Sequence, residues 1–222
     1  MIMNRFGRVF AVLVIVALSS IQLSAWGWGK KDPDYNKSPE KWYNDIRKSL
    51  SHDELEKADK QFLSLRSEHM DSAYIPAVEM ILAQAHLGAE EYLLAAYYLD
   101  EYLKKYGRGA RGEYARYLKI KAAFLGIKDI NKDQKLVIAT LKQAKSFYAS
   151  HRGSRYAPLV QTMIVRLEMA QYLLNEDIAS LYDRIGKEPG AKLYREKNKK
   201  FIYKEDQIEP PKGGFLSKIN PF

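Results

Sequence analysis

The chain has 222 residues, of which 46% are hydrophobic and 28% are charged, and its formal net charge is +9. This composition indicates a folded chain and excludes general disorder, and the absence of cysteine excludes disulfides and thiolate metal sites within it. The positive charge is spread along the chain, so we interpret it as solvated surface and expect no nucleic-acid partner.

Residues 1–25 have the pattern of an export signal, because two arginines precede an apolar run, Val9–Ile21, that is too short to span a membrane. The predicted cleavage region comprises Leu23, Ser24, Ala25, Trp26 and Gly27. Its first three residues match the start of a lipoprotein signal, but Trp26 occupies the position of the acylated cysteine. Cleavage after Ala25, cleavage after Gly27 and retention of the segment as an anchor all remain open.

Residues 26–38 are rich in Gly, Pro and charged residues, and they predict a tether without structure of its own. The first helix is expected to begin at Pro39, with Ser38 as its N-cap, and to end in a turn at Ser51-His52-Asp53. A second helix follows this turn. The apolar positions of the two helices are Trp42, Tyr43, Ile46 and Leu50, then Leu55, Ala58, Phe62 and Leu65.

Residues 79–107 predict two antiparallel helices joined by a tight turn at Gly88. Neither helix can bury its apolar stripe alone, which is the property of a helical repeat protein. The stripes are Met80, Ile81, Ala83, Gln84 and Leu87 on the first helix, and Tyr92, Ala95, Leu99, Tyr102 and Tyr106 on the second. The spacing Ala58-Phe62-Leu65 recurs as Ala95-Leu99-Tyr102 at an offset of 37 residues, close to the repeat of about 34 residues in tetratricopeptide units.

A third helix pair is expected from about residue 113 to residue 148, with a longer turn at 126–133. A fourth begins near Ser154, and its second helix is expected to be short. That short helix contains Ile178, Leu181, Tyr182 and Ile185. Glu188-Pro189 begins a last, polar helix that closes the array. The expected fold is therefore all-α, a tetratricopeptide-like repeat array (α-solenoid) of about four helix pairs plus a capping helix, over residues 39–203.

Residues 204–222 carry three prolines and two glycines and predict an extended C-terminal tail. Such a tail is either without fixed structure or docks through its apolar residues on a partner or on the chain itself. These residues are Phe215, Leu216, Ile219 and Phe222.

The sequence contains no constellation that predicts catalysis, a cofactor or a metal. The four histidines are far apart, and the adjacent carboxylates Glu90-Glu91 and Asp100-Glu101 point apart on a helix. The glycine-rich run at 107–112 lacks the Lys-Ser/Thr of a phosphate loop, so we expect it to end one helix and begin the next. We therefore expect no enzyme activity.

Candidate contacts for a partner or peptide are aromatic, apolar or basic: Tyr74, Leu94, Tyr98, Arg108, Arg111 and Tyr114. Leu94 and Tyr98 lie off the packing stripe of their helix, which predicts a second apolar surface. The tyrosines 74 and 114 are expected to open the first helix of successive units, where an extended peptide would bind. Packing between repeats is the alternative interpretation of these tyrosines.

The order of the segments SPEKWY, LEKADKQFLSLRSEH, AQAHLGAEEYLLAAYYLDEYLKKYG, YLKIKAAF and the Pro-Pro tail resembles the BamD (ComL-like) family of outer-membrane β-barrel assembly factors. The resemblance covers about residues 38–200 and is most specific at 83–106. It implies a periplasmic scaffold at the inner face of the outer membrane. The departure at Trp26 leaves the lipid anchor open.

The resemblance also implies partners. The C-terminal half of such a scaffold binds the periplasmic domains of the barrel-forming assembly protein, and the N-terminal half recognises the C-terminal signal of unfolded outer-membrane proteins. Other assembly lipoproteins are further expected partners. The alternative hypothesis is a periplasmic tetratricopeptide adaptor for cell-wall or envelope enzymes.

Overall fold

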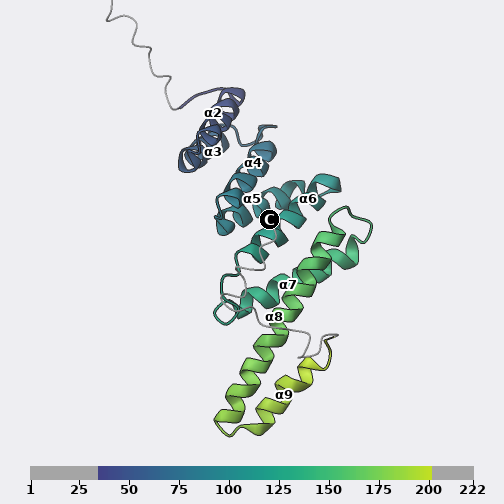
Figure 1. Cartoon of the computed structure of the whole chain (residues 1–222). Coiled ribbons are helices and arrows are strands. Elements are labelled where there is room, and N and C mark those ends of the chain that lie inside the picture. Colours follow the sequence, from purple (N-terminus) through teal and green to yellow (C-terminus); the bar gives the residue numbers. More distant parts are fainter. Residues whose placement is uncertain (1–34, 202–222) are drawn as a thin grey trace, which may run out of the picture. The chain divides into compact units, whose positions relative to one another are not determined.

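The computed structural model describes residues 35–201, and its helices all belong to the unit that begins at Ser38 (Figure 1). Within these residues there are eight helices and no strand, which confirms the all-α prediction. The helices are α2 (Pro39–Ser51), α3 (Leu55–Glu68), α4 (Ile75–Gly88), α5 (Tyr92–Tyr106), α6 (Gly109–Leu125), α7 (Gln134–Ser150), α8 (Ala157–Arg184) and α9 (Glu188–Asn198).

Several predictions fall on residues that the structure does not describe. These are the export signal 1–25, the cleavage region Leu23 to Gly27, most of the tether and the tail 204–222. Among the described helices, none has the length and apolar character that crossing a membrane requires.

Helix α2 begins as its sequence predicts. Ser38 is the N-cap, and its Oγ accepts a hydrogen bond of 3.2 Å from the backbone N–H of Lys41. Pro39 lies in the first turn, where its missing N–H leaves no carbonyl unpaired. Trp42 is 1% exposed, and its Nε1 donates a hydrogen bond of 2.7 Å to Glu68 Oε2 at the end of α3. This contact fixes the start of α2 against the end of α3.

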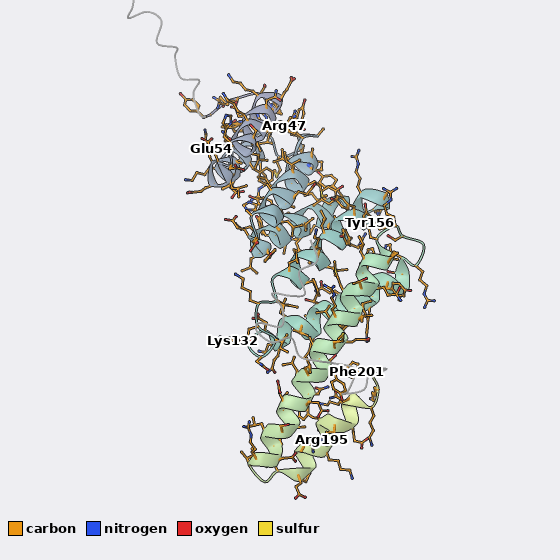
Figure 2. The ribbon with its side chains drawn as sticks, viewed as in Figure 1. Arg47, Glu54, Lys132, Tyr156, Arg195 and Phe201 are labelled. Carbon is orange, nitrogen blue, oxygen red and sulfur yellow. The ribbon has the colours of Figure 1, made fainter. Side chains whose placement is uncertain are left out.

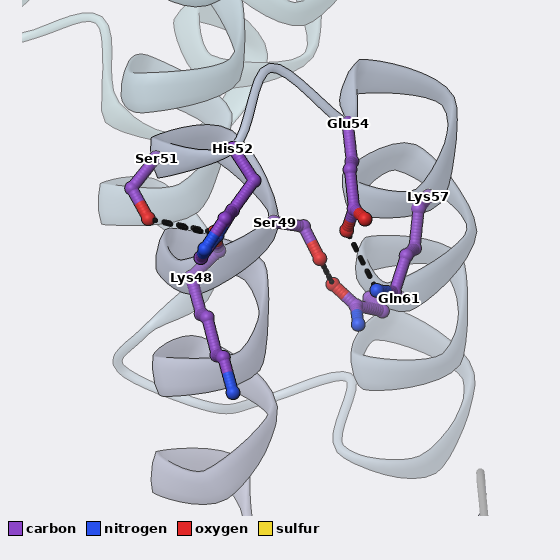
Figure 3. A network of polar contacts seen from close by, with 7 residues as sticks. All are labelled: Lys48, Ser49, Ser51, His52, Glu54, Lys57 and Gln61. Atoms are coloured by element: carbon purple, nitrogen blue, oxygen red, sulfur yellow. Dashed lines mark hydrogen bonds and ion pairs between the residues drawn. The ribbon is translucent and has the colours of Figure 1, made fainter.

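The turn between α2 and α3 is held by side chains on both sides of it (Figure 3). Asp53 adopts a positive φ of 57°, which reverses the chain. Ser49 Oγ donates a hydrogen bond of 2.9 Å to Gln61 Oε1 across the two helices. Lys57 and Glu54 form an ion pair of 2.6 Å in the first turn of α3, but both side chains are exposed, so it contributes little to stability.

Helices α4 and α5 pack closely, but the tight turn between them is not at Gly88 as predicted. Gly88 belongs to α4, and a Cβ added there would meet nothing within 4 Å. The chain reverses at residues 89–91 instead, where Glu90 takes a positive φ of 62° and the N–H of Glu91 donates to His86 O at 2.8 Å. A glycine is therefore not required for this turn.

The buried face of α4 also differs from the predicted stripe. Met80, Ile81 and Leu87 are only partly buried, and Gln84 is exposed. The buried residues are Ile75, Val78, Glu79, Leu82, Ala83 and His86. The predicted stripe is thus partly right, because Ala83 is buried and Met80, Ile81 and Leu87 pack against the core. An apolar criterion passed over the most buried face because two of its six positions are polar. Helix α4 contacts α2, α3 and α5, so most of its circumference is covered.

The predicted repeat register is confirmed at the centre of the array. Ala58, Phe62 and Leu65 are at most 1% exposed on α3, and their counterparts Ala95, Leu99 and Tyr102 are at most 4% exposed on α5. Both triplets belong to hydrophobic faces that are covered by neighbouring helices. The offset of 37 residues therefore relates equivalent core positions of two helix pairs.

Helix α6 begins at Gly109, earlier than the predicted residue 113. The corner between α5 and α6 is very close, because a Cβ added at Gly112 would lie 2.2 Å from the backbone oxygen of Gly107. The run of glycines thus ends one helix and begins the next, as expected. Helix α7 follows the long turn at 126–133. Helix α6 packs more extensively on α5 than on α7.

The prediction of a separate short helix near Ile178 is wrong. Residues Ala157–Arg184 form the single 28-residue helix α8, which contacts α7 and α9. The sequence between Leu173 and Asp177 contains neither glycine nor proline, so nothing interrupts the helix. The predicted last helix is present as α9, and Phe201 beyond it packs edge-on against Tyr172, with ring centroids 6.3 Å apart (Figure 2).

Candidate functional site

A polar network joins α3, α4 and α5 inside the array. His86 on α4 is 1% exposed, and its Nε2 lies 3.0 Å from Asp59 Oδ1 while its Nδ1 lies 2.5 Å from Glu91 Oε2. Tyr98 on α5 donates a hydrogen bond of 2.6 Å to the same Asp59 oxygen, and its ring stacks on the imidazole at 5.4 Å. With a carboxylate at each ring nitrogen, the imidazole favours its doubly protonated form.

The network shifts the pKa of its members in opposite directions. Burial alone would lower the pKa of His86, but the hydrogen bonds to Asp59 and Glu91 outweigh burial and raise it. Burial would raise the pKa of Asp59, but hydrogen bonds from His86 and Tyr98 lower it. The charged pair is therefore the stable state inside the fold, and we assign it a structural role between the first two helix pairs.

An open groove lies further along these helices, between α3, the start of α4 and the end of α5. This α3–α5 groove has a volume of about 640 Å³. Its lining includes the exposed apolar side chains of Leu63 and Met70 and the cations Arg66, Lys104 and Lys105. Arg66 also donates to the hydroxyl of Tyr97 at 3.4 Å. Glu101 also lines the groove and pairs with Arg66 and Lys104, so the groove combines apolar contact area with charges of both signs.

Glu79 gives this groove its unusual feature. The residue is 4% exposed and lines the groove, yet its Oε2 has no hydrogen-bond partner within the described chain. Burial, followed by the nearby Glu101, raises the pKa of Glu79 to about 7, although Lys105 and Arg66 oppose the shift. A buried acceptor without a donor is unfavourable, and protonation of the Glu79 carboxyl, which its raised pKa favours, lowers that cost.

The predicted second apolar surface on α5 is only partly right. Leu94 is 42% exposed, but Tyr98 is 4% exposed and belongs to the His86 network, so the interpretation of Tyr98 as a surface contact is wrong. The exposed neighbours of Leu94 are Leu93, at 87%, and Tyr97, at 43%. The sequence analysis paired Leu94 with Tyr98 because they are four residues apart. Tyr98 instead belongs to the buried face of α5, so the exposed neighbours Leu93 and Tyr97 were not selected.

Tyrosines do open helices, but Tyr114 is not one of them. Tyr74 precedes α4, half-buried and stacked on Tyr43 at 5.0 Å. Tyr114 lies inside α6, half-buried, and its ring is 5.4 Å from that of Tyr156, which precedes α8 (Figure 2). The structural counterpart of Tyr74 is therefore Tyr156, which sequence reasoning did not select.

A short repeated motif marks these two positions in the sequence. In Ser72-Ala-Tyr-Ile-Pro and Ser154-Arg-Tyr-Ala-Pro, the serine Oγ accepts the backbone N–H of the tyrosine, at 3.2 Å and 3.0 Å. In both, the serine N–H donates to the carbonyl of a histidine that ends the preceding helix, His69 or His151. The motif organises a helix start, and searching for it would have identified Tyr156.

Arg108 and Arg111 flank the α5–α6 corner, and both are exposed. Arg108 is the residue before α6 and Arg111 lies in its first turn. Neither lines the α3–α5 groove. Their role in holding an acidic partner remains a prediction.

Three exposed apolar side chains lie on or beside the last two helices. They are Leu181 and Ile185, four residues apart at the end of α8, and Leu193 of α9, which are 48%, 54% and 56% exposed. An ion pair of 2.5 Å between Arg195 and Asp183 joins the two helices, and the side chain of the buried Asn198 accepts a hydrogen bond of 2.7 Å from that of Asn175. These three apolar residues are thus carried by a well-connected helix pair, and we call them the α8–α9 patch.

The described surface has features that suit binding. Within residues 35–201, no three side chains of His, Asp or Glu are grouped so as to hold a metal ion. The charged residues Asp59, Glu91, Asp100 and Glu101 are each engaged with a nearby partner. The described surface includes the α3–α5 groove and the α8–α9 patch, which lie on different helices.

Comparison with known proteins adds two findings. Residues 35–188 match the family model YfiO, which is described as an outer membrane lipoprotein. The chain is also 34% identical, over 181 residues, to the outer membrane protein assembly factor BamD of Helicobacter pylori (strain ATCC 700392 / 26695). That alignment covers 82% of each of the two chains. The residues that the family model matches include the α3–α5 groove and the whole of α8.

Proposed function

The chain belongs to the YfiO family of outer membrane lipoproteins, and from this premise we propose that it is a non-enzymatic scaffold for the assembly of outer-membrane β-barrel proteins. The likeness to an outer membrane protein assembly factor supports this role and supports association with the outer membrane, and we propose that the chain acts at the periplasmic face of that membrane. In this proposal the scaffold holds an unfolded client at one surface and the barrel-forming assembly protein at another.

The α3–α5 groove is the proposed client site, and Glu79 is the observation that carries the proposal. Its Oε2 is buried and unpartnered, so it becomes an acceptor for a backbone N–H of an extended client segment when binding turns the Glu79 side chain toward the groove. Leu63 and Met70 offer apolar contact to the side chains of that segment. Lys105 suits a carboxylate, such as the one at the end of a C-terminal client signal, whereas Arg66 already pairs with Glu101 at 3.6 Å.

The α8–α9 patch is the proposed docking surface for the periplasmic domains of the barrel-forming protein. Its three apolar side chains are about half exposed, which is typical of residues that a partner covers. The patch and the groove lie on different helices, so occupation of one does not require displacement of the other. A single chain therefore offers a separate surface to each of the two partners, as two-site bridging requires.

Two matched substitutions test this division. Leu63 and Leu181 are 52% and 48% exposed, so replacing either with glutamate disturbs the fold little. We expect Leu63→Glu to weaken binding of a peptide that copies the C-terminal strand of a barrel protein by about ten-fold, because a charge enters the apolar part of the groove. Leu181→Glu should leave this peptide's affinity unchanged and weaken binding of the assembly protein's periplasmic domains to a similar degree. Fluorescence anisotropy measures the first interaction and calorimetry the second.

The opposite pattern would contradict the assignment. If Leu63→Glu left client binding unchanged while Leu181→Glu abolished it, the client site would lie on the last helices. If neither purified partner bound the wild-type chain, the bridging mechanism itself would be wrong.

A further inference from the structure

A second groove opens where α6 and α7 separate. Its volume is about 700 Å³, and it is lined by residues of α5, α6 and α7. The separation follows from the packing, because α6 contacts α7 much less than it contacts α5. The bottom of this α5–α7 groove is apolar, formed by Leu103 together with Ile120 and Phe147, which are 3% and 4% exposed.

The rim of the α5–α7 groove is strongly positive. Lys104, Arg116, Lys119 and Lys142 line it, and Asp100 is the carboxylate among the lining residues. Asp100 is occupied by Lys119, whose Nζ lies 2.5 Å from its Oδ1. Arg116 and Lys142 have no ion-pair partner within residues 35–201. Two cations at one groove are therefore without a matching anion.

The position of Arg116 is set by the α5–α6 corner. Its Nη2 lies only 3.3 Å from where a Cβ on Gly107 would be, so the guanidinium packs over the bare backbone of that glycine. Arg116 is half-buried, whereas Lys142 is exposed. A partly desolvated guanidinium that is held in place recognises a carboxylate better than a freely moving lysine does.

We propose that the α5–α7 groove binds an acidic segment of another protein, with a large apolar side chain of the segment on the groove floor and its carboxylates at Arg116 and Lys142. The mixed lining selects this occupant. An isolated phosphate would leave the apolar floor uncovered, and a flat membrane surface would not reach a floor formed by Ile120 and Phe147. The proposal does not depend on the assembly function, because Arg116 and Lys142 line the α5–α7 groove and not the α3–α5 groove, although Lys104 lines both grooves.

The test uses the purified full chain and a short fluorescent peptide in which glutamates alternate with leucines. Two matched peptides replace the glutamates with glutamine or the leucines with glycine. We expect both to bind about ten-fold more weakly than the acidic, apolar peptide, and we expect its affinity to fall with added salt. The double variant Arg116→Gln, Lys142→Gln should also bind about ten-fold more weakly.

Three further variants make the result specific. The double variant Lys187→Gln, Lys192→Gln removes the same charge from exposed positions outside the groove and should bind like wild type. Ser146→Glu adds a carboxylate at an exposed position of the groove and should weaken binding without affecting folding. Leu63→Glu should leave this affinity unchanged, which separates the α5–α7 groove from the client site.

Equal binding of the glutamine and glutamate peptides would overturn the proposal, as would unchanged binding by both the double variant at the rim and Ser146→Glu. Vesicles of phosphatidylglycerol provide the remaining comparison. If they bound the chain through Arg116 and Lys142 while the acidic peptide did not bind, the groove rim would be a membrane contact and the proposal would be wrong.

Discussion

Gly112→Ala is expected to lower the free energy of unfolding by about 3 kcal/mol or more, although alanine normally stabilises a helix relative to glycine by about 1 kcal/mol. The added Cβ would lie 2.2 Å from the oxygen and 2.3 Å from the carbonyl carbon of Gly107. Backbone atoms cannot move aside as a flexible side chain does, so the corner between α5 and α6 must open. Urea unfolding followed by circular dichroism measures the change.

Gly88→Ala is the matched control for this prediction. Gly88 also lies in a helix, but nothing is within 4 Å of its added Cβ. Alanine at this position should therefore be neutral or stabilise the fold by up to about 1 kcal/mol. Equal effects of the two substitutions would show that the close approach of Gly107 and Gly112 does not determine the packing of α6 on α5.

His86→Ala is expected to lower the free energy of unfolding by about 3 kcal/mol near pH 5.5. It removes a fully buried side chain and its hydrogen bonds to Asp59 and Glu91, which are worth roughly 1.5–3 kcal/mol each when a charged group takes part. The Glu91 side chain is 46% exposed, so its bond counts for less than the one to Asp59.

The loss should depend on pH in a defined direction. The pKa of His86 is raised in the fold, so its contribution is complete below the unfolded value of 6.5 and disappears as the pH rises through the raised value. The pKa of Asp59 is lowered, so its contribution is present above the unfolded value of 3.8 and disappears as the pH falls through the lowered value. The difference between wild type and variant should therefore be largest between pH 3.8 and 6.5 and smaller at alkaline pH.

Unfolding of both proteins in urea at about pH 5.5 and about pH 9 tests this sign. Tyr98→Phe provides a partial control, because it removes the hydrogen bond to Asp59 and keeps the ring that stacks on His86. It should lower the free energy of unfolding by about 1 kcal/mol. If the loss of unfolding free energy caused by His86→Ala became larger as the pH rose, this result would contradict the ion-paired network.

The apolar spacing of the chain was sufficient to predict the helices and their register in the centre of the array. Phe62 and Leu99 occupy equivalent buried positions, as the offset of 37 residues requires. Spacing succeeds here because the second helix of each pair, α3 or α5, buries one continuous stripe of small and large apolar residues. The cap at Ser38 was equally predictable, since its interaction is local to the first turn of α2.

Buried polar residues explain much of what the sequence did not predict. Glu79 and His86 define the buried face of α4, but periodicity counts only apolar side chains and so selected the neighbouring positions. Asn175 looks like a residue of a turn and instead lies buried in the middle of α8, because Asn198 of α9 pairs with its side chain. These partners are distant in sequence, so no local pattern reveals them.

The candidate binding surfaces were harder to predict than the fold. Leu94 is exposed as expected, but Tyr98 is buried, and the α3–α5 groove with Glu79 was not anticipated. A groove depends on residues of three helices, and its unpaired acceptor is visible only when the donors around it are known. The sequence contained one usable signal, an acidic residue within the apolar run Val78 to Leu82.

Depletion of the chain in living cells tests the central claim most directly, with the folded barrel proteins of the outer membrane quantified by mass spectrometry. A scaffold for barrel assembly predicts a general decline of these proteins, which a wild-type copy restores. Normal amounts of barrel proteins, accompanied only by defects in the cell wall or in division, would contradict the account.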